Sequence, residues 1–259
     1  MREEKHKFKS SELELAGVLT HPEIETKDCI ILCHGLGVDK DELGQATELA
    51  HRLAEVGFAV FRFDFRCHGE SQGNSIDLTI TGEQTDIDSA VKFLQKLGFE
   101  RFGIQASSFA AGPVVLYAAE NQKHLKALCF YYPLLDYRSM FHPELPWPKE
   151  MFSVEQMNHL NEKGYLELDN KFRIGKALFA EALTIEPFKE LNKLKVPVLF
   201  IHGNKDTYVP YSDSEIYSKV PEVSKLITID GADHGFIFKK EHKEQAFTST
   251  VNFFRQAFF

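Results

Sequence analysis

The sequence lacks a long apolar run. No stretch reaches the ~18 consecutive apolar residues that a membrane-spanning helix needs, so we expect no membrane span. The first residues, Met1 to His6, are charged and no apolar segment follows them, which predicts that a signal peptide is absent. These two absences predict a cytoplasmic protein.

Cysteine is sparse, with 4 in the chain and none in Cys-x-x-Cys spacing. Cys29, Cys33 and Cys129 fall in or beside apolar runs, which indicates reduced thiols that fill space in a core. Four histidines beside possible strand ends also lack the spacing of a metal site: His34, His68, His202 and His234. We therefore expect neither a metal nor any other cofactor.

The chain has no excess of positive charge, since its formal net charge at pH 7 is -8. This balance argues against nucleic acid or an anionic membrane as the main partner. A length of 259 residues, 43% of them hydrophobic, suits one large α/β domain with a substantial core. We expect a single domain over residues 1–259 that is a monomer or a homodimer, two states between which the sequence does not decide.

Short apolar runs alternate with longer helical patterns, as is typical of βαβ units and a parallel sheet. The expected strands cover residues 29–33, 58–65, 101–107, 127–132, 196–202 and 225–230. The expected helices cover residues 41–56, 80–97, 109–121 and 241–258. Residues 7–20 favour an antiparallel hairpin at the edge of the sheet.

The alternation stops after Pro133. Residues 135–190 contain helical stretches without a strong strand, so we interpret them as an inserted lid, or cap, over one end of the sheet. Phe141 and Trp147 are candidates to line an apolar substrate pocket there, because ligand sites are mostly apolar. The alternative is that both side chains form the lid's own core.

Ser108 is the candidate nucleophile. It lies between an expected strand and an expected helix, where a nucleophile elbow of the pattern G-x-S-x-G would expose its hydroxyl above the sheet. The positions two before and two after the serine must be small, and centring on Ser108 places Ala106 and Ala110 there. Centring on Ser107 would place glutamine and phenylalanine at those positions. The alternative is that both serines only cap the helix.

Two further loops that follow strands carry the remaining catalytic candidates. Asp206 can accept a hydrogen bond from a histidine ring and fix its tautomer, and His234 stands between glycines in the later loop. The chain order Ser, Asp, His is that of the α/β hydrolases. Asp136, which follows the strand at residues 127–132, is the rival acid, and a role in turns is the alternative for each aspartate.

Backbone N–H groups near the serine complete the candidate site. Acyl transfer needs donors aimed at the developing oxyanion. One comes from the loop after the first central strand and the other from the residue after the nucleophile, which assigns Leu36 and Phe109. The alternative is that Gly35 and Gly37 only form a turn.

The ordered segments H-G-L-G, F-R-F-D-F-R-C-H-G-E-S, A-S-S-F-A-A-G, H-G-N-K-D-T-Y-V-P and G-A-D-H-G-F resemble the landmarks of the α/β-hydrolase family over roughly Lys27 to Phe238. Within that family the chain looks like bacterial carboxylesterases of the feruloyl or cinnamoyl esterase group. The resemblance implies an α/β-hydrolase fold, with a mostly parallel central sheet flanked by helices and an inserted lid. The chain departs from the pattern where alanines replace the elbow glycines and where Cys67 replaces a glycine.

These observations predict a serine esterase that cleaves carboxylic esters through an acyl-enzyme on Ser108. The expected partner is a small-molecule ester with a small to medium acyl group or an aromatic, cinnamoyl-like one. Three alternatives remain open: a lysophospholipase or monoglyceride lipase, a peptidase-like serine hydrolase, and a non-catalytic binding protein on the same fold.

Overall fold

The computed structural model describes residues 1–142, 144–168 and 171–259. Its central sheet has eight strands, which are, in spatial order, β1 (Arg2–Ser10), β2 (Leu13–His21), β4 (Ala59–Phe63), β3 (Asp28–Cys33), β5 (Arg101–Ser107), β6 (Leu125–Tyr131), β9 (Val198–Gly203) and β10 (Ser224–Ile229). From β4 to β10 every neighbouring pair is parallel, while β1 and β2 form an antiparallel hairpin. β2 joins this hairpin to β4, also antiparallel.

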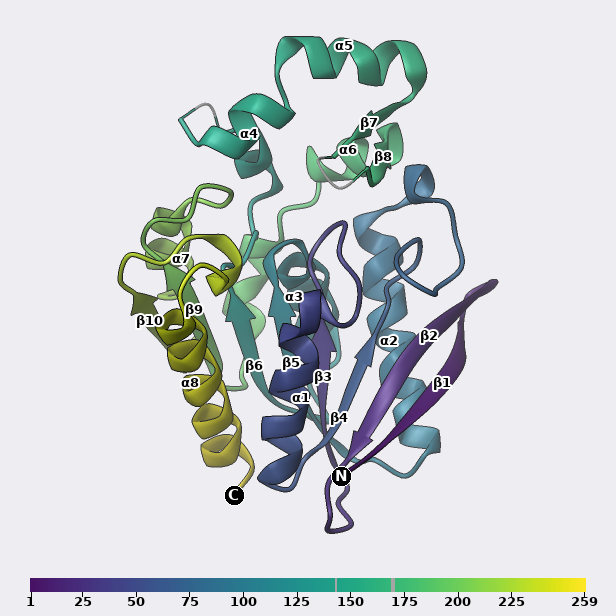
Figure 1. Cartoon of the computed structure of the whole chain (residues 1–259), viewed down its shortest axis with the longest axis vertical. Helices are drawn as coiled ribbons and strands as arrows, with labels where there is room; N and C mark the ends of the chain where they lie inside the picture. The colour runs from purple at the N-terminus through teal and green to yellow at the C-terminus, as the bar shows by residue number, and fades with distance from the viewer. Residues whose placement is uncertain (143, 169–170) are drawn as a thin grey trace.

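Helices cover both faces of the sheet (Figure 1). One face packs against α1 (Gln45–Glu55) and α8 (Lys240–Phe258). The other packs against α2 (Ile80–Lys96) and α3 (Ala111–Glu120). Side chains alternate across β3 because of the two-residue period of a strand, so that Ile30 and Leu32 face α1 while Ile31 faces α2. This is the α/β-hydrolase fold that the sequence predicts.

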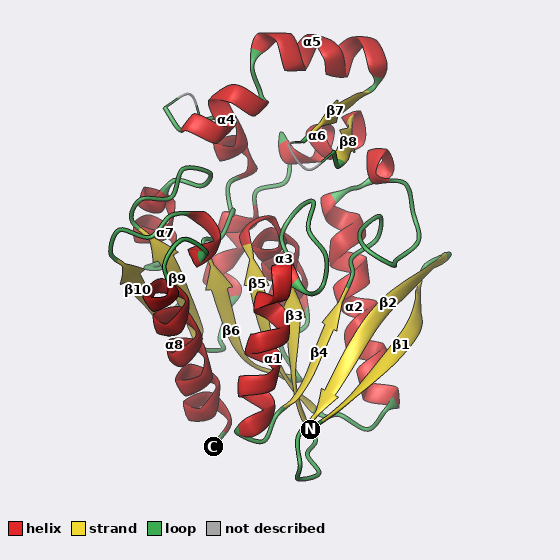
Figure 2. Cartoon of the chain, viewed as in Figure 1, coloured by secondary structure: helices red, strands yellow, loops and turns green. Residues whose placement is uncertain are grey.

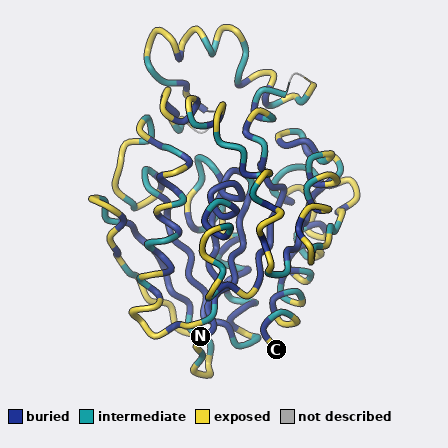
Figure 3. The backbone as a smooth tube through the Cα atoms, turned by 180° about the vertical axis from the view of Figure 1, so that it is seen from behind, coloured by how far each residue is buried: buried dark blue, intermediate teal, exposed yellow. Residues whose placement is uncertain are grey.

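The segment between β6 and β9 rises above the sheet (Figure 2). It contains α4 (Pro146–Met151), α5 (Val154–Lys163), the paired strands β7 (Tyr165–Glu167) and β8 (Arg173–Gly175), and α6 (Lys176–Ala182). Figure 3 shows the sheet in the buried colour and much of this segment as intermediate or exposed. Both chain termini lie at the opposite end of the molecule (Figure 1). The proposed lid, residues 135–190, includes three positions outside the described residues.

The differences from the sequence-based elements are local. β1 begins at Arg2 rather than near Lys7, because an outer strand pairs along one edge only and tolerates a charged, exposed sequence. Helices and strands of three to seven residues were not expected: β7, β8 and α7 (Tyr211–Tyr217). These elements are too short for the period of their apolar residues to be recognised.

Candidate active site

Ser108 lies on the tight turn after β5. Its φ is 54°, in the left-handed region, and a short 3₁₀ turn over Ser108–Ala110 leads from there into α3. Ala106 and Ala110 are fully buried beside it. A Cβ added to Gly35 would lie 3.4 Å from the Ser108 Cβ, so the neighbouring loop packs closely on this turn. A left-handed non-glycine residue costs about 1–2 kcal/mol, which the surrounding packing must offset.

Asp206 and His234 come from the loops after β9 and β10, and they are in contact. His234 Nδ1 lies 2.8 Å from Asp206 Oδ2, while Asp206 Oδ1 accepts the backbone N–H groups of Tyr208 and Val209, both at 2.8 Å. His202 Nε2 lies 3.1 Å from Asp206 Oδ2. Burial by itself raises the pKa of Asp206, but the charges and hydrogen bonds of the two histidines hold it well below its usual range. Asp206 is therefore a buried carboxylate.

The backbone around His234 is fixed by a neighbouring carboxylate. Asp233 accepts the N–H of His234 at 2.7 Å and both the N–H and the hydroxyl of Thr207 at 2.9 Å. It thereby ties the loop after β10 to the loop after β9. Gly231 and Gly235, with φ of 72° and 80°, provide the turns on either side.

The rival acid lies elsewhere in the fold. Asp136 accepts hydrogen bonds from the guanidinium of Arg138 at 2.8 Å and from its backbone N–H at 3.1 Å. It caps the short helical turn Tyr137–Phe141. Of the two aspartates that the sequence offers, the structure brings Asp206 to His234.

The loop after β3 is held by two buried histidines. His34 Nε2 accepts the N–H of Phe65 at 3.0 Å, which leaves its proton on Nδ1, 2.8 Å from the Gly35 carbonyl oxygen. In the same way His68 Nε2 accepts the N–H of Gly37 at 3.0 Å. Burial lowers the pKa of His34 to about 4 and that of His68 to about 3, so both rings are neutral near pH 7. Leu36, the expected oxyanion donor, lies between these anchored peptides.

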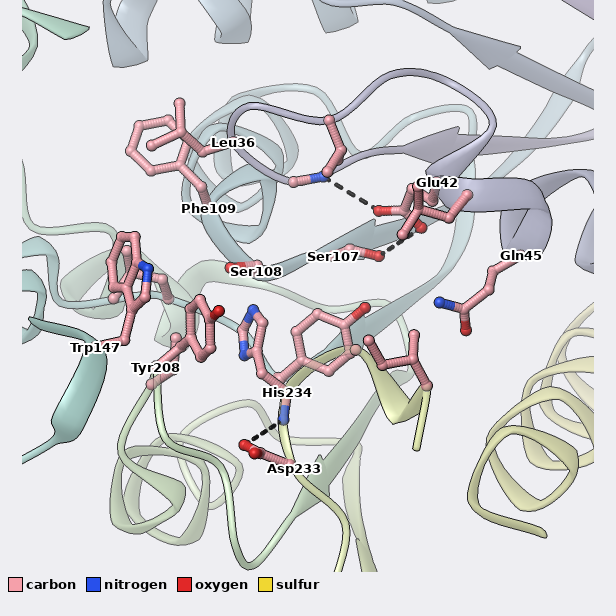
Figure 4. A pocket seen from close by; sticks show the side chains of 18 of the residues that line it. Leu36, Glu42, Gln45, Ser107, Ser108, Phe109, Trp147, Tyr208, Asp233 and His234 are labelled. Carbon is pink, nitrogen blue, oxygen red and sulfur yellow. Dashed lines mark hydrogen bonds between the residues drawn. The ribbon is translucent and has the colours of Figure 1, made fainter. Parts of the chain in front are cut away.

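A cavity of about 350 Å³ lies beside Ser108 and His234 (Figure 4). Ser108, His234, Leu36 and Phe109 all line it. The remaining wall is mostly apolar, with Val38, Leu43, Leu134, Met140, Trp147, Leu168, Val209, Ile237 and Phe238 among its side chains. A cavity of this size and polarity suits a small organic ligand.

The two aromatic residues predicted for the pocket have different places. Trp147 lines the cavity and stacks on Tyr208, with ring centroids 4.8 Å apart. Phe141 does not line it and packs instead against Phe152 and Phe179. The structure therefore corrects the expectation that Phe141 lines the pocket: its ring packs against other aromatic side chains of the lid.

Two polar residues at the site were not predicted from the sequence. Glu42 lines the cavity and contacts both Gly35 and Ser107, although it stands in a charged stretch without any motif. His202, which the sequence suggested to be an ordinary strand-end residue, contacts Asp206. The four-residue spacing of His202 and Asp206 is the one sequence feature that could have indicated this contact.

No group of three or more His, Cys, Asp or Glu side chains within the described part of the chain could hold a metal ion. Over the same residues no helix is long and apolar enough to cross a membrane.

Comparison with solved structures identifies relatives of the whole fold. Est1E from Butyrivibrio proteoclasticus, with ferulic acid bound, superposes with a TM-score of 0.82 at 24% identity over 97% of this chain and 98% of that one. Mouse alpha/beta hydrolase domain-containing protein 10 gives a TM-score of 0.76 at 19% identity over 98% and 99% of the two chains. At these identities the similarity establishes the fold.

Sequence comparison gives partial matches among curated proteins. The uncharacterized protein YqkD of Bacillus subtilis is 26% identical over 83% of this chain and 68% of its own length. Other curated relatives are matched over 36% to 63% of their length. The family model Hydrolase_4, described as serine aminopeptidase, S33, matches residues 24–172, more than half of the chain. On this match and this fold, the chain belongs to the Hydrolase_4 family of serine α/β hydrolases.

Proposed function

We propose that this protein is a serine esterase that hydrolyses carboxylic esters through an acyl-enzyme on Ser108. One observation carries the proposal: Ser108, on a left-handed turn after β5, shares a cavity with His234, whose ring is hydrogen-bonded to the buried Asp206. A nucleophile, a base and a group that orients the base are the three parts that acyl transfer needs.

In the proposed reaction His234 takes the Ser108 proton while Ser108 Oγ forms a bond to the ester carbonyl carbon. The carbonyl oxygen becomes an oxyanion, which the N–H groups of Leu36 and Phe109 stabilise. Collapse of this intermediate breaks the bond to the alkoxide, and His234 returns the proton to that leaving group. Water, deprotonated by the same histidine, then attacks the acyl carbon. The bond to Ser108 Oγ breaks, His234 returns the proton to Ser108, and the acid is released while Asp206 stays ionised throughout.

The cavity wall supports an apolar or aromatic acyl group. Trp147, Tyr208 and His234 form a continuous stack of rings beside the cavity, in which the Tyr208 ring lies between the other two at centroid distances of 4.8 and 4.7 Å. A volume of about 350 Å³ is at the lower end for ligand sites. The ferulic acid bound by Est1E is an aromatic acid of suitable size. We therefore propose small to medium acyl esters or cinnamoyl-like aromatic esters as substrates.

A panel of ester substrates tests the proposal. Wild type, Ser108→Ala and Ser107→Ala would be assayed on p-nitrophenyl esters of two to twelve carbons and on methyl hydroxycinnamates. We expect activity that peaks at short to medium or aromatic acyl groups, a loss of at least about 10³-fold in Ser108→Ala, and substantial activity in Ser107→Ala. Equal rates for wild type and Ser108→Ala would contradict the assignment.

A peptidase activity is the second candidate, since the description of the matching family model is a serine aminopeptidase. The same three side chains can attack an amide. Aminoacyl p-nitroanilides in the same panel separate the two reactions: turnover of these anilides above that of every ester would favour the peptidase. Preference for monoglycerides or lysophospholipids would favour a lipase. Absence of turnover with all substrates would favour a non-catalytic binding role.

We further propose that residues 1–259 form one domain whose lid is residues 135–190. Cytoplasmic location and a monomeric or homodimeric state complete the proposal.

A further inference from the structure

Glu42 connects two segments that approach each other beside the candidate nucleophile. Its Oε1 accepts the N–H of Gly35 at 3.2 Å, and its Oε2 accepts the Ser107 hydroxyl at 3.3 Å (Figure 4). Gly35 directly precedes Leu36, while Ser107 belongs to the turn that carries Phe109. One carboxyl group thus links the two segments that carry the oxyanion donors of the proposed reaction.

The backbone that presents Glu42 is strained. Glu42 and Leu43 have φ of 44° and 56°, two consecutive non-glycine residues in the left-handed region. Each costs about 1–2 kcal/mol, and such residues persist where surrounding contacts require them. The Leu43 side chain is 86% exposed, so burial of that leucine does not account for the strain. The same turn brings the Glu42 carboxyl to Gly35 and Ser107.

The peptides on both sides of Gly35 are held from different directions. Glu42 accepts the N–H of the His34–Gly35 peptide, and His34 Nδ1 donates to the carbonyl oxygen of the Gly35–Leu36 peptide. Because a trans peptide is planar, fixing that carbonyl also fixes the direction of the Leu36 N–H on its other side. His34 therefore sets the direction of this donor, and Glu42 sets its distance from the serine turn.

We propose that Glu42 is a positioning residue that sets the spacing of the two oxyanion donors, Leu36 N–H and Phe109 N–H. The proposal rests on the esterase function proposed above. An oxyanion hole stabilises the transition state only when its donors are already placed around the new oxygen, so a shift of one donor lowers kcat more than it changes KM.

Glutamine is the matched replacement for Glu42. Burial raises the pKa of Glu42 to about 7, although hydrogen bonds from Gly35 and Ser107 and the charge of His234 lower it. Both the carboxylic acid and the carboxylate are therefore populated at neutral pH. Glutamine keeps the shape of the acid, and its amide oxygen can still accept the N–H of Gly35 while its amide group reaches Ser107. Alanine removes both contacts.

The test compares Glu42→Ala and Glu42→Gln with wild type and with Glu55→Ala, a control at an exposed glutamate of α1. Each variant is measured for kcat and KM on the best ester of the panel, for inhibition by an aryl trifluoromethyl ketone, and for thermal unfolding. The ketone forms a hemiketal whose oxyanion occupies the donor site, so its Ki reports that site without product release. Ser108→Ala is the reference for loss of the nucleophile.

For Glu42→Ala we expect kcat to fall about 10–100-fold, KM to stay within about threefold, and the ketone Ki to rise in proportion to the fall in kcat. Glu42→Gln and Glu55→Ala should stay within about threefold of wild type. A folded Glu42→Ala with wild-type kcat and Ki overturns the inference, and so does a loss confined to thermal stability. Failure of the esterase proposal has a different signature, since wild type itself would then not turn over the esters of the panel.

Discussion

Several residues with a left-handed backbone conformation lie around the candidate site. Eight non-glycine residues in the described chain have a positive φ. Four of them line the cavity: Glu42, Leu43, Ser108 and Tyr132. Strain of this kind is retained where the surrounding structure requires an unusual geometry. Cys67, which does not line the cavity, also has a positive φ, of 69°, a conformation that favours glycine.

The two candidate acids give a prediction at this scale. Asp206→Asn should lower kcat about 10³–10⁴-fold, because asparagine cannot hold the His234 tautomer or stabilise the imidazolium. Asp136→Asn should stay near wild type, since its carboxylate contacts Arg138 instead. Steady-state kinetics on one ester checks both variants. A collapse in Asp136→Asn with normal turnover in Asp206→Asn would reverse the assignment.

Individual residues could be predicted from the sequence where sterics or chain order restrict them. The small neighbours Ala106 and Ala110 favour Ser108 over Ser107, and loops that follow strands point to Asp206 and His234. Glu42 could not be predicted, because its contact with Ser107 joins residues 65 apart in the chain. A sequence contains no pattern for a contact made by folding alone.

Aromatic rings join the proposed lid to the loops that carry Asp206 and His234. The indole of Trp147, in the first turn of α4, stacks on Tyr208, which in turn stacks on His234. The backbone N–H of Trp147 also donates to the carbonyl oxygen of Thr207 at 3.4 Å. Helix α4 therefore contacts the segment that follows Asp206 directly, and its position affects one wall of the cavity.

Truncation of this ring should change ester preference. Trp147→Ala removes part of the cavity wall and one stacking partner, so kcat/KM for an aromatic ester should fall about tenfold or more, and that for an acetyl ester much less.

Phe141→Ala is the matched control, because Phe141 packs inside the lid core. It should cost about 2 kcal/mol of stability and leave the ester preference unchanged. Kinetics on an aromatic and an acetyl ester, with urea unfolding, checks the pair. The same selectivity change in both variants would contradict the separate roles.

Whole elements could be predicted where their apolar period is long. The interior strands and the four long helices follow their expected ranges closely, because buried apolar runs and a 3.6-residue period are strong signals. The three-residue strands β7 and β8 have no such period and depend on pairing with each other. The arrangement of the lid, and with it the position of Phe141, could therefore not be predicted from the sequence.

The fold buries two neighbouring histidines that hold the loop after β3. His34 and His68 are each 3% exposed, and their ring centroids lie 4.9 Å apart. An unfolded histidine binds a proton below its ordinary pKa of about 6.5, whereas buried His68 does so only near pH 3. The unfolded state thus binds more protons in this window, so the contribution of His68 to stability declines as pH falls from about 6.5 toward 3.

This linkage predicts a difference between two proteins. Burial raises the pKa of Glu42 to about 7, so the contribution of Glu42 to the free energy of unfolding increases as pH falls below 7. The two effects oppose each other, and the pH dependence of wild-type stability alone does not separate them. Between pH 7.5 and pH 5 the free energy of unfolding should fall by about 2 kcal/mol more in wild type than in His68→Gln. Urea unfolding at both pH values checks this. Parallel losses in the two proteins would contradict a neutral, buried His68.

The site of reaction with a fluorophosphonate tests the central claim most directly. Wild type and the Ser107→Ala and Ser108→Ala variants would be treated with the probe, digested and analysed by mass spectrometry. We predict a single adduct on Ser108 in wild type and in Ser107→Ala, and none in folded Ser108→Ala. An unlabelled wild type, or an adduct on Ser107, would contradict the assignment of Ser108 as the nucleophile.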